Sequence, residues 1–189
     1  MGRIIAFMHV SLDGFVAGPN GEMNWIQTPP EMFEFTGQRI NRSDTALYGR
    51  KTFQMMEGYW PVADQQPNAT RHDIEHAHWY RQVRKVVVSK SMGASENASV
   101  RVIGGDLSRE VEEVKHSTDH EILMFGSPTA THALMAQNLI DGYWLFINPV
   151  LLGQGIPLFK DIRAITELRL LDSTKLDSGV VALNYERPS

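Results

Sequence analysis

Glycines, hydroxyls and basic side chains recur at points where a short apolar run ends. Residues 49–52 (Gly-Arg-Lys-Thr) follow the apolar run 45–48 and enter a predicted helix. Because the N-terminus of a helix is the positive end of its dipole, two cations there indicate a bound anion that neutralises them. Residues 89–91 (Ser-Lys-Ser) follow the run 85–88 and place a cation between two hydroxyls, which suits phosphate oxygens.

The stretch 122–134 forms a third point of this kind. Four apolar residues end at Gly126, and Ser127 and Pro128 suit the N-cap and first turn of a following helix. The free N–H groups at that helix start would bind a phosphate or pyrophosphate. An ordinary strand-to-helix connection without a ligand is the alternative. The stretch lacks the G-x-G-x-x-G fingerprint, so it does not predict a standard dinucleotide fold.

Two other motifs are weaker indications of a ligand. The glycine pair 104–105 precedes Asp106, and an acidic N-cap would repel an anion, so we do not expect nucleotide binding there. His72 and His76 would share one face of a helix as metal ligands do, but His78 would point away. No carboxylate motif or water-activating motif of a metal site accompanies them, which favours a solvated helix over a metal site.

Composition narrows the class of protein. The chain has 189 residues, 42% of them hydrophobic and 21% charged, which is ordinary for one soluble globular domain over residues 1–189. It has no cysteine, so a disulfide framework and a thiolate metal site are excluded. A net charge of −4 gives no footprint for nucleic acid, and no apolar run is long enough to cross a membrane. We expect a cytoplasmic protein.

The order of apolar runs predicts an α/β fold. Strands are expected at residues 4–10, 45–48, 85–88, 100–103, 122–125 and 143–147, with helices after most of them. Residues 164–171 and 180–185 flank an Asp-Ser-Gly turn and predict an antiparallel hairpin. The pattern is typical of a mostly parallel sheet flanked by helices, with an antiparallel C-terminal edge.

These motifs, in this order, resemble the dihydrofolate reductase-like superfamily. The chain is most similar to the reductase domain of the riboflavin-biosynthesis bifunctional deaminase-reductase. Five stretches carry the resemblance and span almost the whole chain: residues 11–14, 47–52, 86–89, 123–129 and 148–159. The chain has no deaminase domain and no zinc-binding cysteines, so the resemblance is to the reductase part alone.

The resemblance implies an NADPH-binding site and no metal. By position in the family pattern, the adenosine-side phosphates would be bound by Gly49, Arg50, Lys51 and Thr52, and the pyrophosphate by Gly126, Ser127 and Thr129. Ser89 and Lys90 would lie beside the 2′-phosphate and the adenine, and Val10 and Ala17 would line the nicotinamide. Cations near two of these turns favour the extra phosphate of NADPH over NADH.

The implied activity is hydride transfer from NADPH to a C=N or C=O bond of a small heterocyclic or sugar-linked substrate. It would resemble the reduction of 5-amino-6-(5-phosphoribosylamino)uracil. A non-catalytic NADPH-binding module is the alternative, because the cofactor residues would be the same in both cases. An assay of NADPH oxidation over a panel of substrates would separate them.

Asp13 and Glu31 are the candidate proton donors. Asp13 lies in the glycine-rich loop after the first strand, and Glu31 lies at the start of the first helix, where the superfamily keeps a carboxylate. A carboxyl group shielded from water has a raised pKa, which suits proton delivery near neutral pH. The alternative reading is structural: Glu31 would compensate the helix dipole, and Asp13 would brace its turn.

Two further expectations follow from the resemblance. The superfamily usually carries a non-proline cis peptide after the strand that Gly126 ends, so we expect a cis bond between Gly126 and Ser127. We also expect a homodimer, by analogy with riboflavin-pathway reductases and because Trp144 and Phe146 would share one face of an apolar strand.

Overall fold

An eight-stranded sheet forms the centre of the molecule, in the order β5-β4-β3-β6-β1-β7-β10-β9. The computed structural model describes residues 1–162 and 164–188. β10 pairs antiparallel with β7 and β9, and the other pairs are parallel. The strands of this sheet are β1 (Arg3–Ser11), β3 (Thr45–Gly49), β4 (Arg84–Val88), β5 (Val100–Ile103), β6 (Glu121–Phe125), β7 (Gly142–Asn148), β9 (Arg169–Lys175) and β10 (Val181–Glu186).

Helices cover both faces of this sheet. α1 (Pro30–Ile40), α2 (Arg50–Glu57) and α3 (Arg71–Gln82) pack on one face, and the short helix η1 (Trp60–Gln65) joins α2 to α3. α4 (Leu107–His116) and α5 (Pro128–Met135) pack on the other face. The predicted mixed and mostly parallel sheet flanked by helices is confirmed.

The near-continuous apolar sequence of β1 follows from its position inside the sheet. Successive side chains of a strand point to opposite faces, so a strand covered on both faces contributes to two cores. Ile4 and Ala6 are buried with α4 and α5, whereas Ile5 is buried with α1, α2 and α3. Phe7 packs against that second core with its ring 4.9 Å from the ring of Phe146.

The C-terminal hairpin is confirmed, but its first strand begins later than predicted. β9 starts at Arg169, so the expected run 164–171 is displaced toward the C-terminus. β9 is the last strand of the sheet, and its side chains are mostly exposed. An exposed edge strand needs no buried face, and its sequence therefore lacks the alternation that would mark its bounds.

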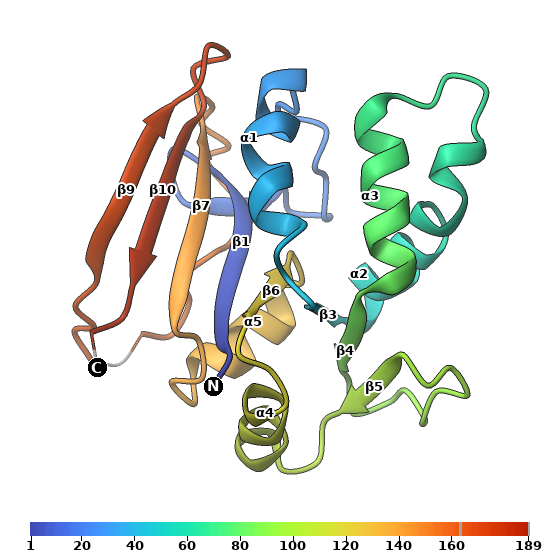
Figure 1. Cartoon of the computed structure of the whole chain (residues 1–189). Helices are drawn as coiled ribbons and strands as arrows, with labels where there is room; N and C mark the ends of the chain where they lie inside the picture. Colours follow the sequence, from blue (N-terminus) through green and yellow to red (C-terminus); the bar gives the residue numbers. More distant parts are fainter. Residues whose placement is uncertain (163, 189) are drawn as a thin grey trace.

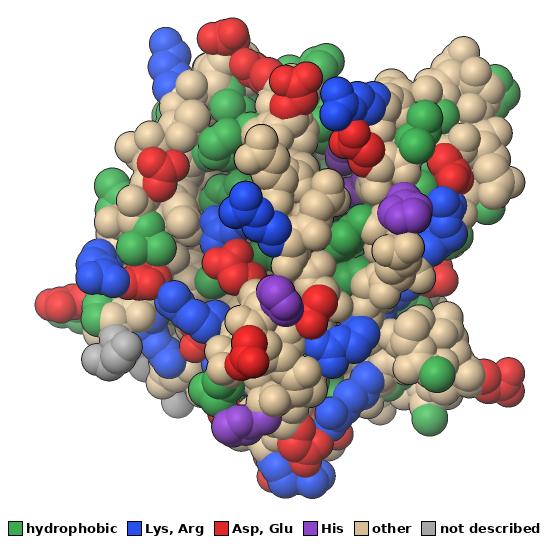
Figure 2. All heavy atoms as spheres, in the orientation of Figure 1, with side chains coloured by type: hydrophobic (Ala, Val, Ile, Leu, Met, Phe, Trp, Pro, Cys, Tyr) green, Lys and Arg blue, Asp and Glu red, His purple; other side chains and the backbone are tan. Residues whose placement is uncertain are grey.

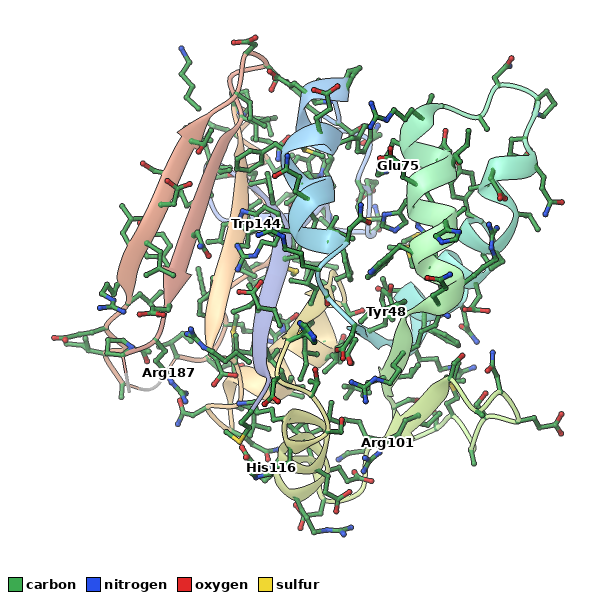
Figure 3. All side chains as sticks on the ribbon, viewed as in Figure 1. Tyr48, Glu75, Arg101, His116, Trp144 and Arg187 are labelled. Carbon is green, nitrogen blue, oxygen red and sulfur yellow. The ribbon has the colours of Figure 1, made fainter. Side chains whose placement is uncertain are left out.

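The apolar face of β7 is covered by the chain itself. Trp144 is 4% exposed and Phe146 is fully buried. The ring of Phe35 on α1 lies 6.0 Å from Trp144, and the Arg39 guanidinium lies 4.5 Å from the centre of the Trp144 ring. Figure 3 shows Trp144 on the sheet beside α1. The expectation that this face forms a dimer interface is therefore wrong, because α1 already occupies it.

The helices that the structure describes are too short or too polar to span a lipid bilayer.

Candidate cofactor and substrate site

Two adjoining cavities lie where parallel strands end. The larger, about 720 Å³, is lined by the residues that follow β3, β4, β5 and β6. The smaller, about 490 Å³, is lined by α1, α2, α3 and the ends of β1 and β6. They share Lys51, Thr52, Ser127 and Pro128. The carboxyl ends of parallel strands in an open sheet are where α/β proteins bind ligands.

The larger cavity has two helix N-termini that no side chain caps. α2 follows Gly49 and α5 follows Ser127, and neither N-cap residue bonds the first turn of its helix through its side chain. The amide groups at the two starts therefore remain available to an anion. Arg50 and Lys51 stand in the first turn of α2, and both side chains line this cavity.

Most of the predicted cofactor residues meet here. Gly49, Arg50, Lys51, Thr52, Ser89, Lys90, Ser127 and Thr129 all line the larger cavity. The Arg50 side chain crosses between two segments, since Nη1 donates a 3.0 Å hydrogen bond to Oγ of Ser91. Within the described residues, no carboxylate forms an ion pair with Arg50, Lys51 or Lys90. The cavity thus presents cations that an anionic ligand could neutralise.

The turn between β6 and α5 has neither the expected cis peptide bond nor the expected side-chain cap by Ser127. Among the described residues there is no cis peptide bond, so the expected cis bond between Gly126 and Ser127 is wrong. Both residues instead take left-handed backbone conformations, with φ of +54° at Gly126 and +62° at Ser127. The Ser127 side chain does not cap α5 but accepts a 2.7 Å hydrogen bond from the N–H of Gly49.

Gly104 and Gly105, the glycine pair that we did not expect to bind nucleotide, line the larger cavity, but their backbone N–H groups are already hydrogen-bonded within the protein. The N–H groups of Gly104 and Gly105 both donate to Oε2 of Glu110, at 2.9 and 3.0 Å. A carboxylate of α4 therefore occupies the position that a phosphate would need. A Cβ at Gly104 would come within 2.3 Å of the Ser89 carbonyl oxygen, so this glycine serves close backbone packing.

The smaller cavity contains Ala17 and Gly126 but not Val10. Ala17 belongs to the short strand β2 (Phe15–Ala17), which pairs with β8 (Ile156–Pro157). Val10 is buried with the core on the α4 and α5 side and lines neither cavity. Val10 is thus not part of this cavity wall, whereas the residue before it, His9, lines the smaller cavity.

Apolar and aromatic side chains make most of the smaller cavity. Figure 2 shows hydrophobic side chains between α1 and α3, where this cavity lies. The ring of His72 stacks on Phe33 at 3.9 Å, and the ring of His76 lies 4.0 Å from that of Trp60. Both histidines thus belong to an aromatic wall, and α3 is not the solvated helix that the spacing favoured. No cluster of three potential ligands for a metal ion occurs in residues 1–162 and 164–188.

Burial keeps the histidines of the smaller cavity neutral. It lowers the pKa of His9 to about 4 and that of His76 to about 3. The pKa of His72 is lowered for the same reason. Burial disfavours the protonated imidazolium, since a charged ring loses its hydration there. These side chains are therefore uncharged near neutral pH.

Asp13 and Glu31 serve as anchors for loops. One Asp13 oxygen accepts from the Ser11 hydroxyl at 2.6 Å, and the other accepts from the Gly153 N–H at 2.7 Å. The Glu31 carboxylate accepts from the N–H groups of Asp177 and Ser178, at 3.0 and 2.9 Å, in the turn between β9 and β10. These two carboxylates line neither cavity.

The expectation that the carboxyl groups of Asp13 and Glu31 have a raised pKa is wrong. The Ser11 hydroxyl lowers the pKa of Asp13, and the Ser178 backbone N–H lowers that of Glu31. Hydrogen bonds donated to a carboxylate stabilise its charged form, and neither group is shielded from water. The structural alternative for Asp13, which the sequence left open, agrees with its contact to Ser11. The Glu31 contacts are also structural, but they hold the turn between β9 and β10, a role that the helix-dipole alternative did not include.

Sequence reasoning missed most of the smaller cavity. Phe33, Trp60, His72 and His76 come from three separate segments, and no local motif joins them. Met32 lies on the buried face of α1, but hydrophobic periodicity along a helix cannot show that this face also borders a cavity. The clearest unused signal was the histidine pair at spacing four, which does share one face of α3.

The predicted dihydrofolate reductase-like fold is confirmed. A model of the family described as RibD C-terminal domain matches residues 3–182. The chain therefore belongs to the RibD C-terminal domain family, which confirms the resemblance inferred from the sequence motifs.

Individual proteins agree with this assignment. Protein YyaP of Bacillus subtilis, which has no assigned function, is 32% identical over 183 residues, 97% of this chain and 94% of that protein. The Thermotoga maritima diaminohydroxyphosphoribosylaminopyrimidine deaminase/5-amino-6-(5-phosphoribosylamino)uracil reductase superposes with a TM-score of 0.65 at 16% identity, over 99% of this chain and 57% of that one. Dihydrofolate reductase from Enterococcus faecalis, complexed with NADP(H), superposes with a TM-score of 0.64 at 14% identity, over 99% of this chain and 97% of that one. At these identities, the two structures show a shared fold.

Proposed function

We propose that this chain is an NADPH-dependent reductase that reduces a C=N or C=O bond of a small ring compound. One observation carries the proposal: a cavity suited to phosphates adjoins an apolar cavity, and Lys51, Thr52, Ser127 and Pro128 border both. A dinucleotide that lies across this border would bring its reactive ring beside a bound substrate. Such positioning is the main contribution that a protein makes to cofactor chemistry.

The residues of the larger cavity fit a dinucleotide phosphate. The uncapped starts of α2 and α5 would donate backbone N–H groups to the phosphate oxygens. Arg50 and Lys51 would add charge-assisted hydrogen bonds from the same side. Lys90, on the loop after β4, would bind the 2′-phosphate that distinguishes NADPH from NADH. NADP(H) in the similarly folded Enterococcus faecalis enzyme supports this choice of nucleotide.

NADPH, when bound, supplies the hydride. Ala17 and Gly126 have small side chains or none at the border of the smaller cavity, which leaves room for a flat ring close to the backbone. Among the described residues that line this cavity there is no carboxylate. We therefore assign the proton to solvent water, which replaces the earlier assignment to Glu31 or Asp13.

A measurement of NADPH binding, followed by one of NADPH oxidation, tests the proposal. Calorimetry with NADP⁺ should detect binding, and absorbance should report NADPH consumption with a panel of pterins, pyrimidinones and aldehydes. Binding without consumption across the whole panel would favour the non-catalytic NADPH-binding module. If neither NADP⁺ nor NADPH binds, both the reductase and the non-catalytic NADPH-binding module are ruled out. Lys90→Ala with Lys160→Ala as control would show whether the cavity is the binding site, since Lys160 lies outside it.

A further inference from the structure

The smaller cavity is almost free of charge. Of the side chains that line it within the described ranges, Lys51 alone belongs to the Lys, Arg, Asp and Glu types. His9, His72 and His76 also line it, but their rings are packed against other aromatic rings. Because burial lowers the pKa of all three, they add no positive charge near neutral pH.

Lys51 is committed to the other cavity under the proposed function. It lies in the first turn of α2, next to Arg50, where the cofactor phosphates would bind. A substrate phosphate held deeper in the smaller cavity would then lose its hydration without gaining a cation. Burial of an unpaired charge of this kind is strongly unfavourable.

The remaining lining suits a flat, uncharged ring system. Phe33 and Trp60 are among the residues that line it, and aromatic side chains bind planar rings by stacking. The cavity also contains Met8, Met23, Met32, Met55 and Met56, which are five of the nine methionines in the chain. Methionine is flexible and polarisable, so a surface rich in it adapts to apolar ligands of different outline.

We infer that the substrate of this chain is an uncharged planar ring compound without a phosphate group. The inference rests on the proposed reductase function and differs from the phosphoribosyl substrate that the family resemblance implied. The reaction remains balanced: one hydride from NADPH forms a C–H bond, the C=N or C=O π bond breaks, and one proton from water reaches the nitrogen or oxygen. NADPH is oxidised to NADP⁺, and no further co-reactant is needed.

Matched ligands that differ by one phosphate test this inference. Protein saturated with NADP⁺ is titrated in a calorimeter with 1-naphthol and with 1-naphthyl phosphate. The same is done with 5-amino-6-(ribosylamino)uracil and its 5-phosphate. Each neutral compound should bind about tenfold more tightly than its phosphate, or better. Equal or tighter binding of either phosphate, or failure of both neutral compounds to bind, would overturn the inference.

A charge placed at the mouth of the cavity should reduce this selectivity. Met55 lies on α2, lines the smaller cavity and is 50% exposed, so Met55→Arg adds a guanidinium without filling the core. Ile74→Arg on α3 is the matched control, because Ile74 is 51% exposed and lines neither cavity. Met55→Arg should reduce the preference for 1-naphthol by about tenfold, and Ile74→Arg should not. If Met55→Arg and Ile74→Arg change the preference for 1-naphthol equally, the ligand does not bind in the smaller cavity, and the inference is rejected.

The proposed reductase function and the inferred class of substrate fail in different ways. If NADP⁺ itself does not bind, the proposed reductase function fails, while the 1-naphthol titration of the nucleotide-free protein still reports on the cavity. If NADP⁺ binds and the phosphate-bearing ligands are preferred, the reductase proposal survives and the inference about its substrate is rejected.

Discussion

The backbone N–H of Gly49 donates a 2.7 Å hydrogen bond to Oγ of Ser127, joining the carboxyl ends of β3 and β6. β3 leads into α2 and β6 leads into α5, so this contact holds the two helix N-termini beside one cavity. A Cβ at residue 49 would lie 2.9 Å from Cβ of Ser127 and 3.0 Å from its Oγ. Only glycine allows this approach without a shift of one segment.

We expect Gly49→Ala to separate these segments and to weaken the nucleotide site. The added methyl group should lower the free energy of unfolding by about 1–3 kcal/mol, as overpacking of a close contact does. Affinity for NADP⁺ should fall by about tenfold or more. Thermal unfolding and calorimetry measure the two effects. Gly93→Ala is the control, because a Cβ there meets nothing within 4 Å; similar behaviour of both variants would contradict the prediction.

Arg50→Ala should weaken NADPH binding by about 1.5–3 kcal/mol if the guanidinium donates charge-assisted hydrogen bonds to a phosphate. The loss follows from its position at the uncapped start of α2. Titration of NADPH and NADH against the wild type and the variant measures it. Arg71→Ala provides the comparison, since that side chain is 88% exposed on α3 and pairs with Glu75. Equal affinity of the wild type for the two nucleotides would remove the basis for the choice of NADPH.

Glu31→Gln should destabilise the protein at neutral pH without loss of hydride transfer. Hydrogen bonds from Ser178 and Asp177 lower the pKa of Glu31 in the folded state below its ordinary value of 4.5. The resulting stabilisation is complete above pH 4.5 and is lost as the pH falls through the lowered folded-state pKa. The melting temperatures of variant and wild type should therefore differ at pH 7 and converge in acid. A large fall in single-turnover rate at saturating substrate would restore Glu31 as the proton donor.

His9→Phe should make stability less sensitive to acid. Burial lowers the folded-state pKa of His9 to about 4, below the ordinary value of 6.5. The unfolded chain then binds a proton that the folded protein does not, so stability is lost as the pH falls from 6.5 toward 4. Between pH 7 and pH 5 the wild type should lose about 2 kcal/mol that the variant keeps. Urea unfolding at both pH values measures this; parallel losses would show that His9 is protonated in the folded state.

The sequence alone determined the order of strands and helices, because burial on both faces requires the continuous apolar runs of β1, β4 and β6. It also marked the ends of β3 and β6 as candidate anion sites, since glycine followed by an unopposed cation or hydroxyl is a local signal; that an anion binds there stays a prediction. These features depend on residues close together in the chain. The bounds of β9 were less certain because an exposed edge strand carries no such pattern.

Tertiary structure decided which side chains share a cavity and which carboxylates are tied elsewhere. Glu31 meets Ser178 across 147 residues, and Asp13 meets Gly153 across 140, so no local pattern could assign them as loop anchors. Likewise, only the placement of α1, α2 and α3 over the sheet shows that His9 lines the smaller cavity, whereas Val10 is buried with the opposite core. Contacts between distant segments depend on how the layers pack, and packing is a property of the whole chain.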